Sequence, residues 1–286
     1  MDNKELVQKF TADLALYEKK VLSSLLEIHN ITPQQYIQVV LNEVRKNPKL
    51  IIAFKENPTS MFASIIAGAE IGLMPSDLLG EFYLIPRNLK QANNTYKMTV
   101  CCQIGYKGLV NLLLRSGDIT RIHTDIVYEG EEFTVIKGLE PNIIHNTNFD
   151  VPRTADKIKY AYAVAKSNNG EYSFDVVTRK QIENIRDLPK IKNDLYFNDT
   201  LGLNRWMERK VALTQLAKML PKDYYAKKAL ALDGQMEGGA LLSLDEENKV
   251  KIIQPNPTKS RRSNYGKLLN LDEKGNLITD EESPKE

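Results

Sequence analysis

The chain has 286 residues, 42% of them hydrophobic, and carries 39 Lys and Arg against 37 Asp and Glu. This length allows one large or two small domains with a buried core. The two cysteines, Cys101 and Cys102, are adjacent, so they exclude a disulfide framework and a CxxC metal site and indicate a reducing compartment. No apolar run approaches the length of a membrane span, and the polar, acidic residues 1–5 are not typical of a signal peptide. We therefore expect a cytoplasmic protein without a membrane partner.

The first 75 residues predict helices. Between residues 6 and 28 apolar side chains recur every three or four positions, which indicates one long amphipathic helix. Thr-Pro at 32–33 and Asn-Pro at 47–48 and 57–58 each place a capping residue before proline at the first helical position, so a helix should follow each pair. The first pair also begins a capping-box pattern. Gly72 should end the last helix.

From residue 81 onward, strands should alternate with short helices. The expected strands cover residues 81–85, 96–102, 119–128, 133–137, 143–144, 160–166 and 172–177, and the expected helices cover 108–115, a segment capped at 178–181, about 201–220, and 224–232. The first strand should stop at Pro86. Asn-Asn-Gly at 168–170 predicts a hairpin turn. The fold class is therefore α+β, with a largely antiparallel β-sheet core flanked by N-terminal and C-terminal helices.

The composition changes after about residue 234. Residues 246–286 contain 8 basic and 8 acidic side chains and three prolines, which is typical of a disordered tail. We divide the chain into a folded domain over residues 1–235 and a flexible C-terminal tail over 236–286, which offers a candidate segment for docking a partner.

The net charge of +2 hides an uneven distribution. Local balances reach +5 over residues 87–121, +5 over 205–228 and +4 over 153–192. One such stretch alone is best explained as a solvated face. Three of them, with aromatic residues among the charges, favour a polyanionic partner such as nucleic acid.

The helix expected near residues 201–220 carries an unusual pair of arginines. At 100° per residue, Arg205 and Arg209 lie in the same sector as the leucines of its second half, and Trp206 lies beside them. Arginine on an apolar face is costly unless it is paired or faces a charged ligand. Two interpretations remain open: the first half of the helix lines an anion-binding groove, or the arginines form internal ion pairs with Asp or Glu.

Gln-Ile-Gly-Tyr-Lys-Gly at residues 103–108 places two glycines around an aromatic residue and a lysine, just before a helix. In this interpretation the glycines let the backbone approach a phosphate, Tyr106 stacks and Lys107 supplies charge. An ordinary glycine-bounded turn is the alternative. The hexapeptide matches neither a Walker A loop nor a dinucleotide-binding GxGxxG.

Catalytic and metal-binding patterns do not stand out. The three histidines have no metal-ligand spacing, and neither a G-x-S-x-G elbow nor a paired-carboxylate motif occurs. We expect no cofactor: no Walker motif occurs, so ATP should not be required, and Mg²⁺ stays open without being indicated by the sequence.

Taken together in order, several motifs resemble the RecT family of phage and prophage single-strand annealing recombinases, collinearly over residues 30–225. The motifs are Gly-Leu-Met-Pro at 72–75, Glu-Phe-Tyr-Leu-Ile-Pro at 81–86, Gln-Ile-Gly-Tyr-Lys-Gly-Leu at 103–109, Arg-Ser-Gly at 115–117, Val-Tyr at 127–128, Tyr-Ala-Tyr-Ala-Val-Ala-Lys at 160–166, Trp-Met at 206–207 and Lys-Met-Leu-Pro at 218–221. Arg-Lys-Val at 209–211 departs from a Lys-Lys-Thr-like run, so the hydroxyl is absent at Val211.

The resemblance implies a protein that coats single-stranded DNA and pairs it with a complementary strand without ATP, with residues 1–235 serving DNA binding and oligomerisation. The implied partners are single-stranded DNA, the annealed duplex, further copies in rings or helical filaments, a phage exonuclease and a host single-stranded DNA-binding protein. Two rival classes remain: a metal-dependent nuclease, and a scaffold that binds DNA or acidic protein without annealing.

From charge and motif position we select candidate DNA contacts. For phosphate they are Lys107, Arg115, Arg205, Arg209 and Lys210, supported by Arg87 and Arg153; for stacking or wedging, Tyr106 and Trp206; and for hydrogen bonds, Gln103 and Asn111. For Trp206, burial in the core is the stronger alternative.

Overall fold

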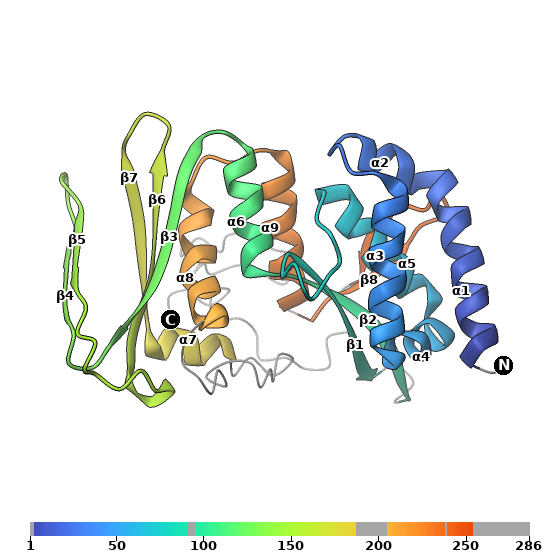
Figure 1. Ribbon diagram of the computed structural model, residues 1–286, viewed down its shortest axis with the longest axis horizontal. Coiled ribbons are helices and arrows are strands. Elements are labelled where there is room, and N and C mark those ends of the chain that lie inside the picture. Colours follow the sequence, from blue (N-terminus) through green and yellow to red (C-terminus); the bar gives the residue numbers. More distant parts are fainter. Residues whose placement is uncertain (1–2, 91–94, 187–204, 238, 254–286) are drawn as a thin grey trace, which may run out of the picture. The chain divides into compact units, whose positions relative to one another are not determined.

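The computed structural model describes residues 3–90, 95–186, 205–237 and 239–253, and one compact unit spans Met1–Gln254 (Figure 1). The N-terminal part is helical, as predicted. Its elements are α1 (Asn3–Tyr17), a π-helical turn (Glu18–Leu22), α2 (Ser23–Glu27), α3 (Pro33–Lys46), α4 (Pro48–Glu56) and α5 (Pro58–Ile71). The long helix expected from residue 6 to 28 is thus confirmed, with one π-helical turn between α1 and α2.

The proline-led helix starts are confirmed, but only two of the three capping side chains form a cap. Asn47 accepts a hydrogen bond from the Lys49 backbone N–H, and Asn57 accepts one from Ser60. The Thr32 side chain makes no cap hydrogen bond, so the predicted capping box is wrong there. Gly72 ends α5 in the left-handed region at φ 66°.

The strands form small antiparallel sheets, which confirms the α+β class. The described strands are β1 (Phe82–Lys90) paired with β2 (Tyr96–Ile104); β3 (Ile119–Tyr128), β6 (Ile158–Ser167) and β7 (Tyr172–Thr178) in the order β3-β6-β7; β4 (Glu132–Ile136) paired with β5 (Asn142–Asn146); and β8 (Leu241–Leu244) paired with β9 (Val250–Ile253). In place of one central sheet, the described residues form several separate ones.

The first strand does not stop at Pro86, as expected, but continues to Lys90. Pro86 lies opposite Val100, and β1 pairs with β2 alone. Proline is tolerated because one side of an edge strand needs no N–H donor. This hairpin packs against α4 and α5, which carry much of the buried core.

The remaining helices lie between the β3-β6-β7 sheet and the N-terminal helices, and α6, α8 and α9 run side by side (Figure 1). They are α6 (Tyr106–Arg115), α7 (Arg179–Arg186), α8 (Trp206–Met219) and α9 (Tyr224–Glu237). The capping box at α7 is confirmed, since the Gln181 backbone N–H donates to Thr178 Oγ1 and the Thr178 N–H donates to Gln181 Oε1. Residues 201–204 of the expected helix lie outside the described residues.

The compact unit extends further than the boundary expected at residue 235. The hairpin β8–β9 packs on α5, and Leu242 is buried. Of the tail expected over residues 236–286, residues 238 and 254–286 lie outside the described residues. Within the described part of the chain, no helix combines the length and apolar character that crossing a membrane requires.

Candidate nucleic-acid interface

One exposed face of α6 brings together four of the predicted contact residues. Lys107, Asn111 and Arg115 follow one another at intervals of four residues, which places them along one side of the helix. They line a groove of about 620 Å³ with Tyr106 at its start. The other lining residues are Glu81, Val110 and Leu114. The apolar side of the helix packs into the core with Leu109, Leu112 and Leu113.

The glycines of residues 103–108 serve a purpose different from the one expected. A Cβ at Gly105 would lie 2.1 Å from the Gly80 carbonyl oxygen, and a Cβ at Gly108 would lie 2.2 Å from the Glu81 oxygen. Both glycines therefore allow close packing of α6 against the preceding segment, and they are buried. The interpretation that they admit a phosphate to the backbone is wrong.

Two aromatic side chains lie beside the groove. Tyr106 Oη and Thr124 Oγ1 are 2.8 Å apart, so the phenol ring is held in place. The Trp206 ring centroid lies 5.2 Å from that of Tyr106, and Trp206 is 44% exposed. The core position considered for Trp206 is therefore wrong, because the indole is exposed at the surface.

Arg115 occupies the end of the groove but is anchored to the protein. Its Nη2 donates to the Gly72 carbonyl and its Nη1 donates to the Ile71 carbonyl, at 3.0 and 3.3 Å. Nη1 also lies 3.3 Å from His29 Nδ1. Because a guanidinium only donates, His29 Nδ1 accepts and His29 Nε2–H donates to the Glu70 carbonyl 3.0 Å away. Burial chiefly, and Arg115 to a lesser degree, lower the pKa of His29.

The other predicted arginines are engaged within the protein. Arg209 donates to the Thr124 carbonyl and forms a 2.8 Å ion pair with Asp125, so the internal-pair interpretation holds for it. Arg205 is the N-cap of α8, is 3% exposed and donates to the Arg153 carbonyl at 3.2 Å. Arg153 itself pairs with the buried Glu131 at 3.1 Å.

Lys210 is likewise an internal residue. Its ammonium lies 2.7 Å from Asp233 Oδ2, and both side chains are 5% exposed. Asp233 also accepts a hydrogen bond from the Ile104 backbone N–H, which ties α8 and α9 to β2. The prediction that Lys210 contacts phosphate is wrong, because its ammonium group is paired with the buried carboxylate of Asp233.

The last three predicted residues lie on β1, β2 and α6. Arg87 is half-buried opposite Thr99, and Gln103 is half-buried opposite Tyr83; neither lines the α6 groove. Asn111 lines it and donates to Glu81 Oε1 at 2.8 Å, which places an amide and a carboxylate at its edge.

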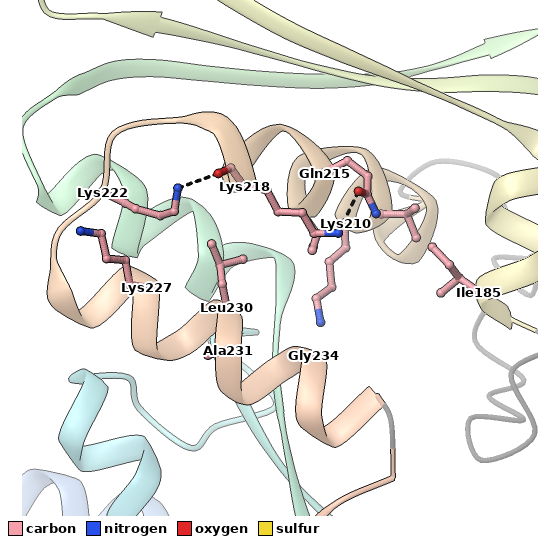
Figure 2. A pocket seen from close by; sticks show the side chains of 11 residues that line it. Ile185, Lys210, Gln215, Lys218, Lys222, Lys227, Leu230, Ala231 and Gly234 are labelled. Atoms are coloured by element: carbon pink, nitrogen blue, oxygen red, sulfur yellow. Dashed lines mark hydrogen bonds between the residues drawn. The ribbon is translucent and has the colours of Figure 1, made fainter. Parts of the chain in front are cut away.

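Sequence reasoning missed a second basic region, a pocket whose lining includes Lys210 as well as three further lysines. Lys218, Lys222 and Lys227 lie around a pocket of about 340 Å³ between α8 and α9 (Figure 2). The +5 balance over residues 205–228 already contained these lysines. Helical spacing alone could not separate them from Lys210 and Lys228, which form ion pairs with Asp233 and Glu70.

Cysteine and metal chemistry find no support among the described residues. Burial raises the pKa of both Cys101 and Cys102, which keeps the thiols protonated and unreactive. No group of three or more His, Cys, Asp or Glu side chains lies close enough to hold a metal ion in that part of the chain.

Comparison with known proteins supports the resemblance seen in the motifs. The RecT family model matches residues 34–247. Protein RecT from Escherichia coli (strain K12) is 33% identical over 219 residues, which is 75% of this chain and 76% of that protein. The residues that the family model matches contain the groove along α6, the aromatic pair Tyr106 and Trp206, and the pocket between α8 and α9. The chain belongs to the RecT family.

Proposed function

We propose that this protein binds single-stranded DNA along the exposed face of α6 and anneals it to a complementary strand without hydrolysing a nucleotide. The observation that carries the proposal is the groove beside α6, where exposed cationic side chains lie next to a half-buried tyrosine and an exposed tryptophan, in a chain that belongs to the RecT family. Single-stranded nucleic-acid sites commonly combine these two elements, because cations bind the backbone and aromatic faces stack on bases of any sequence.

The exposed charge of the groove comes mainly from Lys107. This side chain is exposed near the N-terminal end of α6, where unsatisfied backbone N–H groups add a favourable field for an anion. Arg115 is exposed at the other end, and its two carbonyl contacts hold its charge in position. Asn111 lies between them and offers hydrogen bonds to sugar or phosphate. Three positions along one helix face can therefore follow an extended strand.

The aromatic pair supplies the contact with bases. Trp206 is held against Tyr106 on one side, so a base can stack on its exposed side. Tyr106 in turn is fixed by Thr124 on β3. Base stacking on such a platform contributes about 1–3 kcal/mol per base and does not depend on sequence.

Annealing then needs no external energy source. Each matched step of a DNA duplex gains about 1.4 kcal/mol of stacking on average, so correct pairing is favourable once phosphate repulsion is neutralised. The protein has to hold the backbone and leave the base edges accessible. A backbone-directed groove with one stacking platform meets that requirement.

Several wider properties belong to the same proposal. We infer that the protein acts in the cytoplasm during phage recombination, assembles into oligomers or filaments on DNA, and works beside an exonuclease that exposes the strand and a host single-stranded DNA-binding protein. The apolar side chains exposed on α1 and in the segment after α2, Leu16 and Ile28, are suited to contact another copy.

The test is annealing of two complementary fluorescent oligonucleotides, followed by energy transfer, with chelator present and no nucleotide. We expect pairing to be faster with the full chain than without protein, and slower with Lys107→Ala. Loss of labelled strand upon addition of Mg²⁺ would instead indicate a nuclease. Binding of the oligonucleotides with no faster pairing would indicate a scaffold that does not anneal. Each of these two outcomes would contradict the proposal.

A further inference from the structure

The pocket between α8 and α9 has a composition different from that of the α6 groove. Three of its lysines lie at the end of α8, in the segment between α8 and α9, and in the first turn of α9. The apolar part of the lining comes from Ile185, Val211, Leu230 and Ala231. Figure 2 shows the ammonium groups of Lys222 and Lys227 at the same end of the pocket, whereas the Lys218 side chain runs along α8 toward Gln215. The remaining lining residues are Lys210, Thr214, Gln215 and Gly234.

The three lysines carry charge that nearby carboxylates do not neutralise. Within the part of the chain that the structure describes, no residue that lines the pocket is acidic, and Lys218, Lys222 and Lys227 form no ion pair. Lys218 donates to Gln215 Oε1 at 2.9 Å, and Lys222 donates to the carbonyls of Lys218 and Leu220. Their partners inside the protein are therefore neutral oxygens, and the positive charges remain available to an anion.

Two carboxylates, one on α9 and one directly before it, are engaged with other partners. Asp233 binds Lys210 and the Ile104 N–H in the protein interior. Asp223 Oδ1 accepts a hydrogen bond from the Ala226 N–H at 2.7 Å, as the cap of α9. Lys228, the next residue after Lys227, turns to Glu70 instead. Of these two adjacent lysines, Lys228 therefore forms an ion pair and Lys227 lines the pocket.

Lys222 experiences an electrostatic cost that a bound anion would relieve. Burial lowers its pKa, and repulsion from Lys227 lowers it further. A phosphate between the two ammonium groups would replace repulsion by attraction and provide hydrogen-bond acceptors for both.

The lining also indicates which part of a nucleic acid would contact it. Among the described residues that line the pocket there is no aromatic side chain and no arginine, so this part of the lining lacks the stacking and bidentate groups that recognise bases. Lysine acts as a point charge for phosphate, and Thr214 and Gln215 add polar groups beside it. Such a lining binds a backbone and leaves bases outside.

We propose that this lysine pocket is a second nucleic-acid site, which binds the phosphodiester backbone of a DNA strand through Lys218, Lys222 and Lys227. The inference rests on the proposed function, since a polynucleotide is already the ligand of the α6 groove. A strand held here by its phosphates presents unstacked bases, the state that a complementary strand needs for pairing.

The experiment measures the salt dependence of binding between the full chain and a fluorescein-labelled 30-nucleotide oligo-dT. The variant is K218A/K222A/K227A. The control is K9A/K49A/K55A, which removes three exposed lysines from the N-terminal helices and gives the same change in net charge. Because each lost contact reduces the log–log slope by about 0.7, we expect the pocket variant to lose roughly two units of slope and the control to keep the wild-type value.

A Gln version of the pocket variant and a thermal melt of each protein separate lost binding from lost folding, because Lys222 also caps α8. A pocket variant that melts like the wild type and retains the slope of the control overturns the inference. A fluorescein-labelled poly-Glu peptide provides the second arm. If the pocket lysines are needed for this peptide and not for oligo-dT, the site binds acidic protein, and the inference is again overturned.

The two proposals fail in different ways. If the wild-type chain does not bind oligo-dT, the proposed function fails. If the wild type binds and Lys107→Ala lowers the slope while the pocket variant does not, only the second site fails.

Discussion

The groove beside α6 and the pocket between α8 and α9 are both basic, yet their positive charges have different surroundings. At the groove, the Arg115 guanidinium is fixed to two backbone carbonyls, and nearby Arg209 is paired with Asp125. At the pocket, three lysines contact neutral oxygens or none, and its described lining residues include no aromatic side chain. The groove therefore combines an anchored arginine and an exposed lysine with an exposed indole, whereas the described lining of the pocket offers lysine charge without an aromatic ring.

This contrast shows what a local charge balance measures. Residues 87–121 and 205–228 each have a balance of +5. In the second segment, Arg209, Lys210 and Lys228 are neutralised by carboxylates from other parts of the chain. Whether a lysine is paired with a carboxylate or available to a ligand therefore depends on the fold, because tertiary packing brings the acidic side chains close to some lysines and not to others.

The largest expected effect is a loss of stability when the buried ion pair of Lys210 is broken, a pair that the other three pocket lysines lack within the described part of the chain. Asp233→Ala leaves the Lys210 ammonium buried without its carboxylate, so the free energy of unfolding should fall by about 3–5 kcal/mol. Urea denaturation measures it. The double variant Lys210→Met/Asp233→Leu should recover much of the loss, because it removes both charges. A Lys210→Ala variant of wild-type stability with weakened DNA binding would place Lys210 among the ligand contacts after all.

The next effect concerns the packing of α6. Gly105→Ala places a methyl group against the Gly80 carbonyl, and overpacking of this kind typically costs about 1–3 kcal/mol. Gly234→Ala is the matched control: it lies inside α9 with nothing within 4 Å of the added methyl, so it should stabilise the protein by roughly 0.5–1 kcal/mol. Thermal melts compare the two. Equal melting temperatures would remove the close approach as the reason for glycine at 105.

The third effect concerns base stacking, which we expect at Trp206 beside the groove and not at the pocket. Trp206→Ala should weaken oligo-dT binding by about 1–3 kcal/mol while changing stability little, because the indole is 44% exposed. Tyr224→Ala, which removes an exposed aromatic residue at the start of α9, should leave the affinity unchanged. Fluorescence anisotropy measures both variants. Similar losses in the two would mean that stacking is not localised at the groove.

The smallest expected effect is a pH dependence at the end of the groove. The pKa of His29 is lowered from 6.5 in the folded chain, so below that pH the unfolded chain takes up a proton that the folded chain resists. The free energy of unfolding should therefore decrease as the pH falls from 6.5 through the lowered pKa, as protonation also opposes the Arg115 contact. Urea denaturation at several pH values should show a shallower decrease for His29→Gln. An identical decrease would exclude His29 as its source.

Local features of the fold could be predicted because their causes lie within a few residues. Helices begin at Pro33, Pro48 and Pro58 because proline fits the first turn, and the hairpin around Gly170 follows from its turn residues. The extension of β1 through Pro86 could not be predicted, since it depends on the strand having one unpaired edge.

The candidate site could be predicted only in part, for the same reason. The face of α6 follows from the four-residue spacing of Lys107, Asn111 and Arg115. The partners of Arg209 and Lys210 are 84 and 23 residues away in sequence, at Asp125 and Asp233. Such pairs are set by tertiary packing, which periodicity and local charge do not contain.

The most direct test of the central claim uses the single tryptophan of the chain, Trp206. Its intrinsic fluorescence is titrated with unlabelled oligo-dT at low salt and then reversed with added salt. If DNA stacks on the exposed indole, emission should be quenched to saturation and recover as salt releases the strand. An emission spectrum that stays unchanged while anisotropy shows the oligonucleotide bound would contradict the account and place the DNA away from the α6 groove.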